Sequence, residues 1–168
     1  MSKSSSQNRS DPALWTLEQA SRALASGRIS SLELTRACLT RIEAINPRLN
    51  AFLAVEKDEA LKAARAADRA RAEGDKRPLL GIPLAQKDMF ARKGKTMSRG
   101  AAQPNGVTQK DSAVIARLNA AGALNLGPLH MNEFAFGVGG HNDHFGHAHN
   151  AWDVTRVTGG SSSGSGTA

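Results

Sequence analysis

Two kinds of side chain in this sequence could together activate a hydroxyl group. Lys87 follows an apolar stretch at 79–85, and Ser161 opens a run of three serines in a Gly/Ser-rich segment. A lysine in apolar surroundings loses its charge readily, because desolvation lowers its pKa, and the neutral amine can act as a general base. A serine hydroxyl is a weak nucleophile until such a base removes its proton. Lys87 and the serines near 161 therefore predict half of a serine–lysine hydrolase.

Each of these features has a simpler explanation when it is taken alone. Residues 159–166 have the composition of a flexible linker or tail, and Lys87 could be an ordinary exposed lysine. A glycine-rich turn can also present backbone N–H groups to an anion. This turn lacks the lysine of a phosphate-binding loop, and no helix is expected after it. Nucleotide binding is therefore disfavoured.

Five histidines within twenty residues raise the question of a metal site. Imidazole is a common ligand of zinc and nickel. The glycines between the histidines break any helix that would align them, and no cysteine or regular carboxylate completes a ligand set. We therefore expect neither a metal nor another cofactor. The five are His130, His141, His144, His147 and His149.

The elements that must position Lys87 and the serines alternate between helices and short apolar runs. Apolar residues at three- and four-residue intervals predict helices, and short apolar runs next to glycine or proline predict strands. Helices followed by a helix–strand alternation are typical of an α/β fold. From Gly137 onward we expect loops. The expected helices cover 11–27, 30–46 (capped by Ser30 or Ser31), 56–73 and 111–121, and the expected strands cover 51–55, 79–85 and 122–127.

The composition is that of a globular chain. The 168 residues are 40% hydrophobic and 22% charged, which suits one domain. A single cysteine, Cys38, excludes an internal disulfide and is expected as a small apolar residue on a helix face. The sequence has neither a run of about 18 apolar residues nor a secretory signal. We therefore expect a soluble, cytoplasmic protein without a membrane partner, disordered at residues 1–12 and folded over 13–168.

The formal net charge of +7 comes from basic residues between 57 and 110. A basic surface is one requirement for nucleic-acid binding. Here the basic residues alternate with acidic ones at helical spacing, which favours a solvent-exposed helix face with i,i+4 ion pairs. No stacking aromatic residues accompany them. We therefore expect no nucleic-acid partner.

Four short motifs follow one another along the chain: GIPLAQKD at 81–88, MNEFAFG at 131–137, NAWD at 150–153 and GGSSSG at 159–164. In order and approximate spacing they resemble the amidase signature family of amide hydrolases. With the preceding helices, the resemblance covers roughly residues 12–168. It implies an α/β fold with a mixed β-sheet flanked by α-helices, of which this chain would form the N-terminal, incomplete portion.

The resemblance also implies a Ser–Ser–Lys triad, two members of which can be placed by matching motifs. Lys87 matches the catalytic lysine, and Ser161 matches the middle serine, which family members hold after a cis peptide bond. The two would relay a proton through hydrogen bonds of about 2.6–3.2 Å. Phe134 and Phe136 are expected in the core rather than against a ligand. The other residues implied near the substrate, in the active-site loop or as hydrogen-bonding partners, are Met131, Ser162 and Ser163.

The third triad member is expected elsewhere. In the family the acyl-forming serine lies in a D-x-G-G-S motif that also supplies the oxyanion hole, and these 168 residues contain no such motif. Without these groups no acyl-enzyme forms, and a tetrahedral intermediate loses its largest stabilising contribution. We therefore expect this chain to be a truncated, inactive part of an amidase, whether by natural truncation, as a pseudogene product or as an incomplete sequence.

The activity implied by the resemblance is hydrolysis of the C–N bond of a small carboxylic amide, not of a peptide backbone. An alternative is the A subunit of the tRNA-dependent amidotransferase, which uses the same triad as a glutaminase and passes ammonia to a partner subunit. The MNEF motif favours that alternative, whereas the His-rich residues 140–146 favour stand-alone amidases. A non-catalytic remnant or partner-bound piece is a third alternative. For a full-length family member a homodimer stays open.

Overall fold

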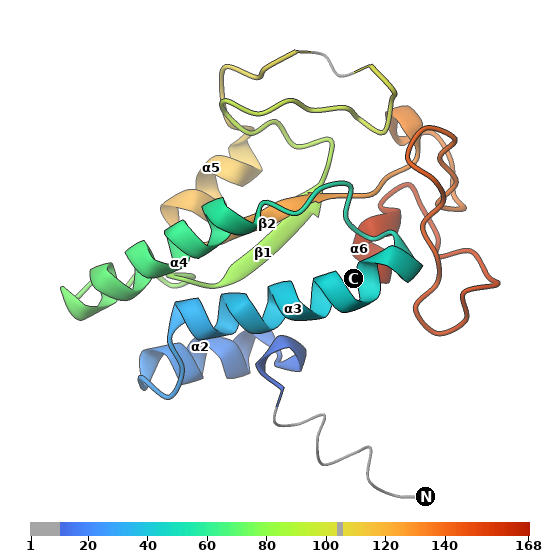
Figure 1. The fold of residues 1–168 in the computed structure, drawn as a ribbon. Helices are drawn as coiled ribbons and strands as arrows, with labels where there is room; N and C mark the ends of the chain where they lie inside the picture. The colour runs from blue at the N-terminus through green and yellow to red at the C-terminus, as the bar shows by residue number, and fades with distance from the viewer. Residues whose placement is uncertain (1–10, 104–105) are drawn as a thin grey trace, which may run out of the picture. The chain divides into compact units, whose positions relative to one another are not determined.

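The computed structural model describes residues 11–103 and 106–168 (Figure 1). Helices and strands alternate in its second half, which gives the predicted α/β class. Residues 1–10, which make up most of the segment expected to be disordered, lie outside the described residues. In chain order the elements are η1 (Pro12–Leu14), α2 (Leu17–Ala25), α3 (Ser31–Leu49), α4 (Lys57–Ala72), β1 (Pro83–Lys87), α5 (Ala113–Ala120), β2 (Leu124–Leu129), η2 (Glu133–Ala135) and α6 (Ser163–Thr167).

The chain divides into two compact units. The first unit contains the described residues up to 43 together with 56–84 and 118–126. The second unit contains 44–55, the described residues of 85–117, and 127–168. Lys87 and the serines at 161–163 therefore all belong to the second unit.

Side-chain caps define the first helices of the first unit. Ser30 and Glu33 form a capping box at the start of α3: the Ser30 hydroxyl accepts the Glu33 N–H at 3.1 Å, and the Glu33 carboxylate accepts the Ser30 N–H at 2.8 Å. Thr16 and Gln19 do the same for α2. The helix predicted from Asp11 is thus divided, because Asp11 caps only the short η1 and α2 begins after Thr16.

The core of the first unit is built from small and aliphatic side chains. Helix α4 buries one face made of alanines at three- and four-residue spacing, as predicted. Cys38 packs partly buried against the main cluster, and burial raises the pKa of its thiol to about 11, as befits an apolar role. The alanines of α4 are Ala60, Ala64 and Ala67, and the main cluster consists of Ala20, Ala23, Leu24, Ile29, Leu34 and Ile82.

Polar contacts join α3, α4 and the segment before β1. The Asp68 carboxylate on α4 accepts the backbone N–H groups of Ser31 at 2.7 Å and Leu32 at 3.1 Å, so it satisfies the free N–H groups at the start of α3. The Ser31 hydroxyl donates to the Gly81 carbonyl at 2.7 Å. Gly81 has φ +77°, and a Cβ there would lie 2.7 Å from Ser31 Oγ, so no side chain fits.

Strands β1 and β2 pair in a two-stranded parallel sheet. Leu124 N–H donates to the Ile82 carbonyl near the start of both strands, and Asp88 N–H donates to the Leu129 carbonyl at 3.1 Å near their ends. Parallel strands require a crossover connection, which here contains α5. The carboxyl ends of both strands therefore lie at the same edge, so Lys87, which ends β1, and His130, which follows β2, are neighbours in the fold.

Two predictions about the segment around Asn50 are wrong. Helix α3 continues through Pro47 to Leu49, although we expected it to end at Asn46–Pro47. The Asn50 N–H still donates to the Asn46 carbonyl at 2.8 Å, so the last turn is complete despite the proline. The strand expected at 51–55 is reduced to a single antiparallel bridge between Phe52 and Leu129. Pro128, next to that bridge, has no N–H to extend a ladder.

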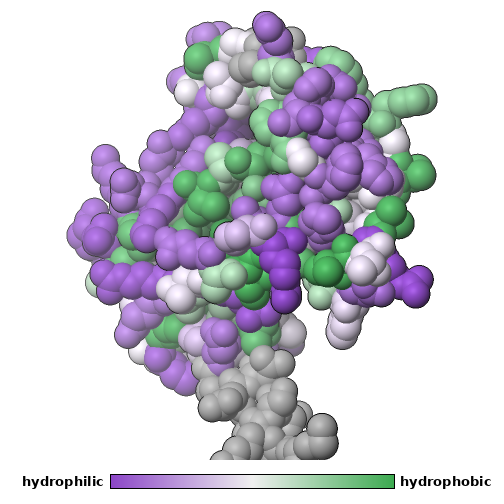
Figure 2. Space-filling model, turned by 45° about the vertical axis from the view of Figure 1, so that its right-hand side comes forward, coloured by the Kyte–Doolittle hydropathy of each residue, from purple (hydrophilic) through white to green (hydrophobic). Residues whose placement is uncertain are grey.

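The long C-terminal loops also depart from expectation in two places. Residues 163–167 form the short helix α6 within the Gly/Ser-rich segment that we expected to be a loop. Phe134 and Phe136 were expected in the core, but their exposed fractions are 62% and 92%. Phe134 and Ala135 have positive φ in the turn η2, a conformation in which the chain departs from a helix. Figure 2 shows hydrophobic side chains reaching the surface among hydrophilic ones.

Among the described residues, no helix has the length and apolar character needed to cross a membrane.

Candidate active site

Lys87 lies at the carboxyl end of β1 and is only 8% exposed. Its Nζ donates a hydrogen bond to Ser161 Oγ at 2.7 Å, across 74 positions of sequence. The structure thus brings together the two residues that the motifs singled out, at a distance suited to direct proton transfer.

Burial affects the pKa of the Lys87 amine. The pKa of its amine is lowered, because removal from water disfavours the charged ammonium form. The next residue, Asp88, is also buried, and its carboxylate accepts the N–H of Ser98 at 2.9 Å and the Ser98 hydroxyl. A lysine with a lowered pKa yields more of the neutral amine at a given pH, and this is the form that can accept a proton.

Backbone contacts place Ser161 opposite Lys87. The peptide bond between Gly160 and Ser161 is cis, and the Ser161 carbonyl accepts the Asn132 N–H at 3.2 Å. A Cβ on Gly160 would collide with the side chain of Asn132 and lie 3.1 Å from the Gly137 carbonyl. The glycine before Ser161 is therefore required by the close approach of the loop that contains Asn132.

The two serines after Ser161 lie in different surroundings. Ser162 is exposed, and its carbonyl accepts the N–H groups of Ser165 and Gly166 in the first turn of α6. Ser163 is fully buried, and its Oγ lies 2.7 Å from Nδ1 of His130. Of the two, only Ser163 is enclosed by the protein, and a role of either serine in assisting the triad stays a prediction.

The side chain of Met131 is fully buried. Its carbonyl accepts a hydrogen bond from the Asn142 side-chain amide at 3.1 Å, and Asn142 also donates to the Gly100 carbonyl at 2.7 Å. In this structure Met131 is a core residue of the second unit, and its expected place in an active-site loop stays a prediction.

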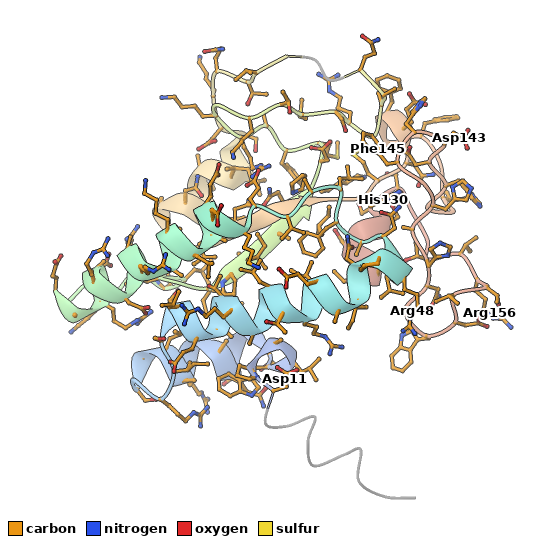
Figure 3. All side chains as sticks on the ribbon, viewed as in Figure 1. Asp11, Arg48, His130, Asp143, Phe145 and Arg156 are labelled. Carbon is orange, nitrogen blue, oxygen red and sulfur yellow. The ribbon has the colours of Figure 1, made fainter. Side chains whose placement is uncertain are left out.

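Sequence reasoning missed His130, which it considered only as a metal ligand. Its ring is buried next to α6 (Figure 3), between Ser163 and the Gly146 carbonyl, 2.7 Å from Nε2. Burial lowers the pKa of this histidine. The signal in the sequence was its position, three residues after the strand expected at 122–127 and directly before the MNEFAFG motif.

The remaining histidines have individual partners. Nε2 of His144 lies 3.1 Å from a Glu133 carboxylate oxygen. His147 accepts the Asn142 N–H at 3.1 Å and stacks edge-on against His141, with ring centroids 4.9 Å apart. Within residues 11–103 and 106–168, no group of three or more histidine, cysteine, aspartate or glutamate side chains is arranged to hold a metal ion.

A surface depression of about 650 Å³ lies among the loops of the second unit. Asn132 joins it to the site, because this residue both lines the depression and donates its N–H to Ser161. Carboxylates, amides and apolar side chains all contribute to the lining, so it offers contacts for both the polar and the apolar part of a small molecule. Its other lining residues are Glu133, Phe136, Gly137, Val138, Gly139, His141, Asn142, Asp143 and Val157.

Comparison with known proteins gives consistent results. Residues 33–168 match the model of the family described as Amidase. Over 154 residues the chain is 46% identical to the A subunit of the glutamyl-tRNA(Gln) amidotransferase from Methylobacillus flagellatus, covering 91% of this chain and 31% of that protein. It thus spans about a third of the length of the curated relatives that it matches.

Solved structures agree with this assignment. The native peptide amidase from Stenotrophomonas maltophilia aligns with a TM-score of 0.82 and 33% identity, covering 90% of this chain and 33% of that one. A protein from a vestigial complex linked to the origins of an s-triazine catabolic enzyme aligns with a TM-score of 0.87 and 36% identity, covering 91% of this chain and 34% of that one. The chain belongs to the amidase signature family.

Proposed function

We propose that this chain supplies the lysine and the relay serine of an amide-hydrolysing site. The observation that carries the proposal is the 2.7 Å contact between Lys87 Nζ and Ser161 Oγ, made by a buried amine with a lowered pKa. In the neutral amine, Nζ has a lone pair that can accept the Ser161 hydroxyl proton. Ser161 can then accept a proton from a second hydroxyl, so Lys87 acts as a base on that hydroxyl through Ser161.

The reaction needs one more group. A nucleophilic serine would attack the amide carbonyl while its proton passes to Ser161 Oγ and the Ser161 proton passes to Lys87 Nζ. The resulting lysine ammonium would return a proton to the leaving nitrogen through Ser161, releasing ammonia or an amine, and water would then cleave the acyl-enzyme. The nucleophile is expected in a D-x-G-G-S segment, which these 168 residues do not contain. Reading the coding DNA past codon 168 tests whether such a segment follows.

For the substrate we propose the side-chain amide of glutamine, with ammonia passed to a partner protein. This proposal is supported by the 46% and 47% identity to the A subunits of two glutamyl-tRNA(Gln) amidotransferases. A stand-alone amidase for other small carboxylic amides is the second candidate, and the similarity to a peptide amidase favours it.

A substrate panel tests both candidates. Ammonia release would be measured with L-glutamine, a simple aliphatic amide and a peptide amide, using the longest product of the gene. Glutamine turnover that exceeds the other two is expected, and Lys87→Ala should lower the rate about 10²–10⁴-fold while the circular dichroism spectrum stays unchanged. Preferred turnover of another amide would favour the stand-alone amidase. A folded product that turns over none of the three would contradict both candidates and favour a non-catalytic remnant.

A further inference from the structure

His130 is the residue at which several segments of the second unit meet. Its side chain is fully buried. Its N–H donates to the Ala51 carbonyl at 2.8 Å, and its carbonyl accepts the Gly164 N–H at 2.9 Å. Its ring lies between Ser163 Oγ and the Gly146 carbonyl, with both distances 2.7 Å. One residue thus connects the end of β2, the segment after α3, the His-rich loop and the start of α6.

The partners of the ring decide where its hydrogen lies. A backbone carbonyl can only accept a hydrogen bond, so Nε2, which faces Gly146, must carry the hydrogen. In a neutral ring Nδ1 is then an acceptor, and the Ser163 hydroxyl donates to it. Burial lowers the pKa of His130; the hydrogen bond to the Gly146 carbonyl opposes this, His147 adds a smaller lowering, and the net shift favours the neutral form. The facing segments 50–52 and 159–168 contain no titratable side chain.

The contact between His130 and Ser163 lies close to the lysine–serine pair, because Ser163 is two residues after Ser161. Segments 130–132 and 161–164 are joined twice, by the Gly164 N–H to the His130 carbonyl and by the Asn132 N–H to the Ser161 carbonyl. Gly164 has no room for a side chain, because a Cβ there would lie 2.5 Å from His130 N. The placement of Ser161 therefore depends on how closely α6 approaches His130, and the Ser163 hydroxyl is the side-chain link in that approach.

We propose that His130 is a positioning residue, which acts through the Ser163 hydroxyl to set where Ser161 lies relative to Lys87. That His130 positions Ser161 follows from the contacts described above. That this positioning matters for catalysis rests on the proposed function. Neither His130 nor Ser163 is required to touch a substrate.

The first test uses the unchanged chain. Long-range ¹H–¹⁵N spectra of ¹⁵N-labelled protein report which imidazole nitrogen carries the hydrogen. For His130 we expect hydrogen at Nε2, an unprotonated Nδ1, and a titration midpoint below the ordinary histidine value of about 6.5. A neutral ring with its hydrogen at Nδ1, or a midpoint at or above that ordinary value, would overturn the proposal.

The second test compares two hydroxyl deletions in α6. Ser163→Ala removes the link to His130, whereas Thr167→Val removes a buried hydroxyl that donates to the His149 carbonyl at 3.0 Å. Hydrogen exchange of the Asn132 N–H reports the placement of Ser161, to which it is bonded. We expect Ser163→Ala to speed this exchange about tenfold or more through local opening, and Thr167→Val to leave it unchanged. Equal exchange in both variants would refute the positioning role.

A third measurement separates this proposal from the proposed function. Loosening Ser161 admits water to Lys87, so Ser163→Ala should raise the pKa of Lys87 toward its ordinary value, and Thr167→Val should not. Suppose that Lys87 in the unchanged chain titrates like an exposed lysine, while the His130 tautomer and the Asn132 exchange behave as expected. In that case the proposed function fails and the positioning role stands. If instead Lys87 titrates with a lowered pKa while the His130 tautomer and the Asn132 exchange differ from expectation, the positioning role fails and the proposed function stands.

Discussion

The two units of this chain are stabilised by different kinds of contact. In the first unit, helices bury stripes of alanine and leucine, and most polar contacts lie at helix ends. In the second unit, side-chain amides bind the backbone of neighbouring loops. Asn132 donates to the His141 carbonyl at 3.0 Å and accepts the Gly140 N–H at 3.2 Å, while Asn142 bridges two further carbonyls.

This difference teaches where chemistry can be placed in such a chain. Apolar burial is non-directional, so it stabilises a helix face without fixing any one atom closely. Hydrogen bonds to backbone groups are directional, so they can hold a loop residue such as Ser161 at a defined distance from Lys87. The candidate site accordingly lies in the unit that is richer in loops and in polar contacts to the backbone.

The largest expected effect on stability lies in the first unit. Leu24 is 1% exposed within the main cluster, so Leu24→Ala should lower the free energy of unfolding by about 2–5 kcal/mol, from lost burial and the cavity left behind. Urea denaturation gives the value. Leu17 in the same helix is 53% exposed and provides the control, because Leu17→Ala should change stability by less than about 0.5 kcal/mol. Similar losses in both variants would mean that burial in α2 does not stabilise this unit.

The next effect concerns close backbone approach in the second unit. Gly164→Ala would force a Cβ against the Ala51 carbonyl and His130 N, and we expect a loss of about 1–3 kcal/mol, as for overpacking. Gly166, also in α6, has its nearest neighbour for a Cβ at 3.3 Å, a tight contact that a shift of a few tenths of an ångström relieves, so Gly166→Ala should cost clearly less than Gly164→Ala. Thermal denaturation of both variants checks this, and equal melting temperatures would exclude the close approach.

A smaller effect is expected at the polar end of a first-unit helix. Asp68→Ala removes the acceptor of the Ser31 and Leu32 N–H groups, which should cost about 0.5–2 kcal/mol, as for loss of a helix cap. Asp68→Asn keeps one acceptor oxygen and should lose less. Urea denaturation of the two variants sets the order. If the amide variant were the less stable one, the carboxylate would not act as a cap.

The sequence was a sufficient guide where one physical signal dominated. The alanine spacing of α4 and a serine cap at position 30 or 31 were readable because a helix depends mostly on its own residues, and the structure places that cap at Ser30. The loops gave no such signal: Phe136 follows a turn of positive φ and is 92% exposed, and the helix at 163–167 is bonded to the distant His130 carbonyl through the Gly164 N–H. The Lys87–Ser161 pair was expected from the motifs. The role of His130 was not, because it depends on a carbonyl at Gly146 and a hydroxyl at Ser163, and neither has a sequence pattern.

A further comparison takes one lysine from each unit and leaves the fold intact. Burial lowers the pKa of Lys87, whereas the Glu43 carboxylate, 2.6 Å from Nζ of Lys57, raises the pKa of that exposed amine. Competitive acetylation with trace acetic anhydride over a pH series measures both midpoints in one sample. We expect Lys87 to react with a midpoint below the ordinary value of about 10.4 and Lys57 above it. Glu43→Gln should lower only the Lys57 midpoint.

The same two lysines should contribute to stability with opposite pH dependence. For Lys87 the unfolded chain binds the proton more tightly than the folded one, so stability should rise with pH between its lowered pKa and the ordinary value. For Lys57 the favourable pairing is fully present below the ordinary value and is lost as pH rises through its raised pKa. Urea denaturation of Lys87→Met and Glu43→Gln against the parent chain separates the two. A stability difference for Lys87→Met that stays constant from neutral to alkaline pH would show that Lys87 is not desolvated in the folded chain, and the neutral base of the proposed reaction would lose its physical origin.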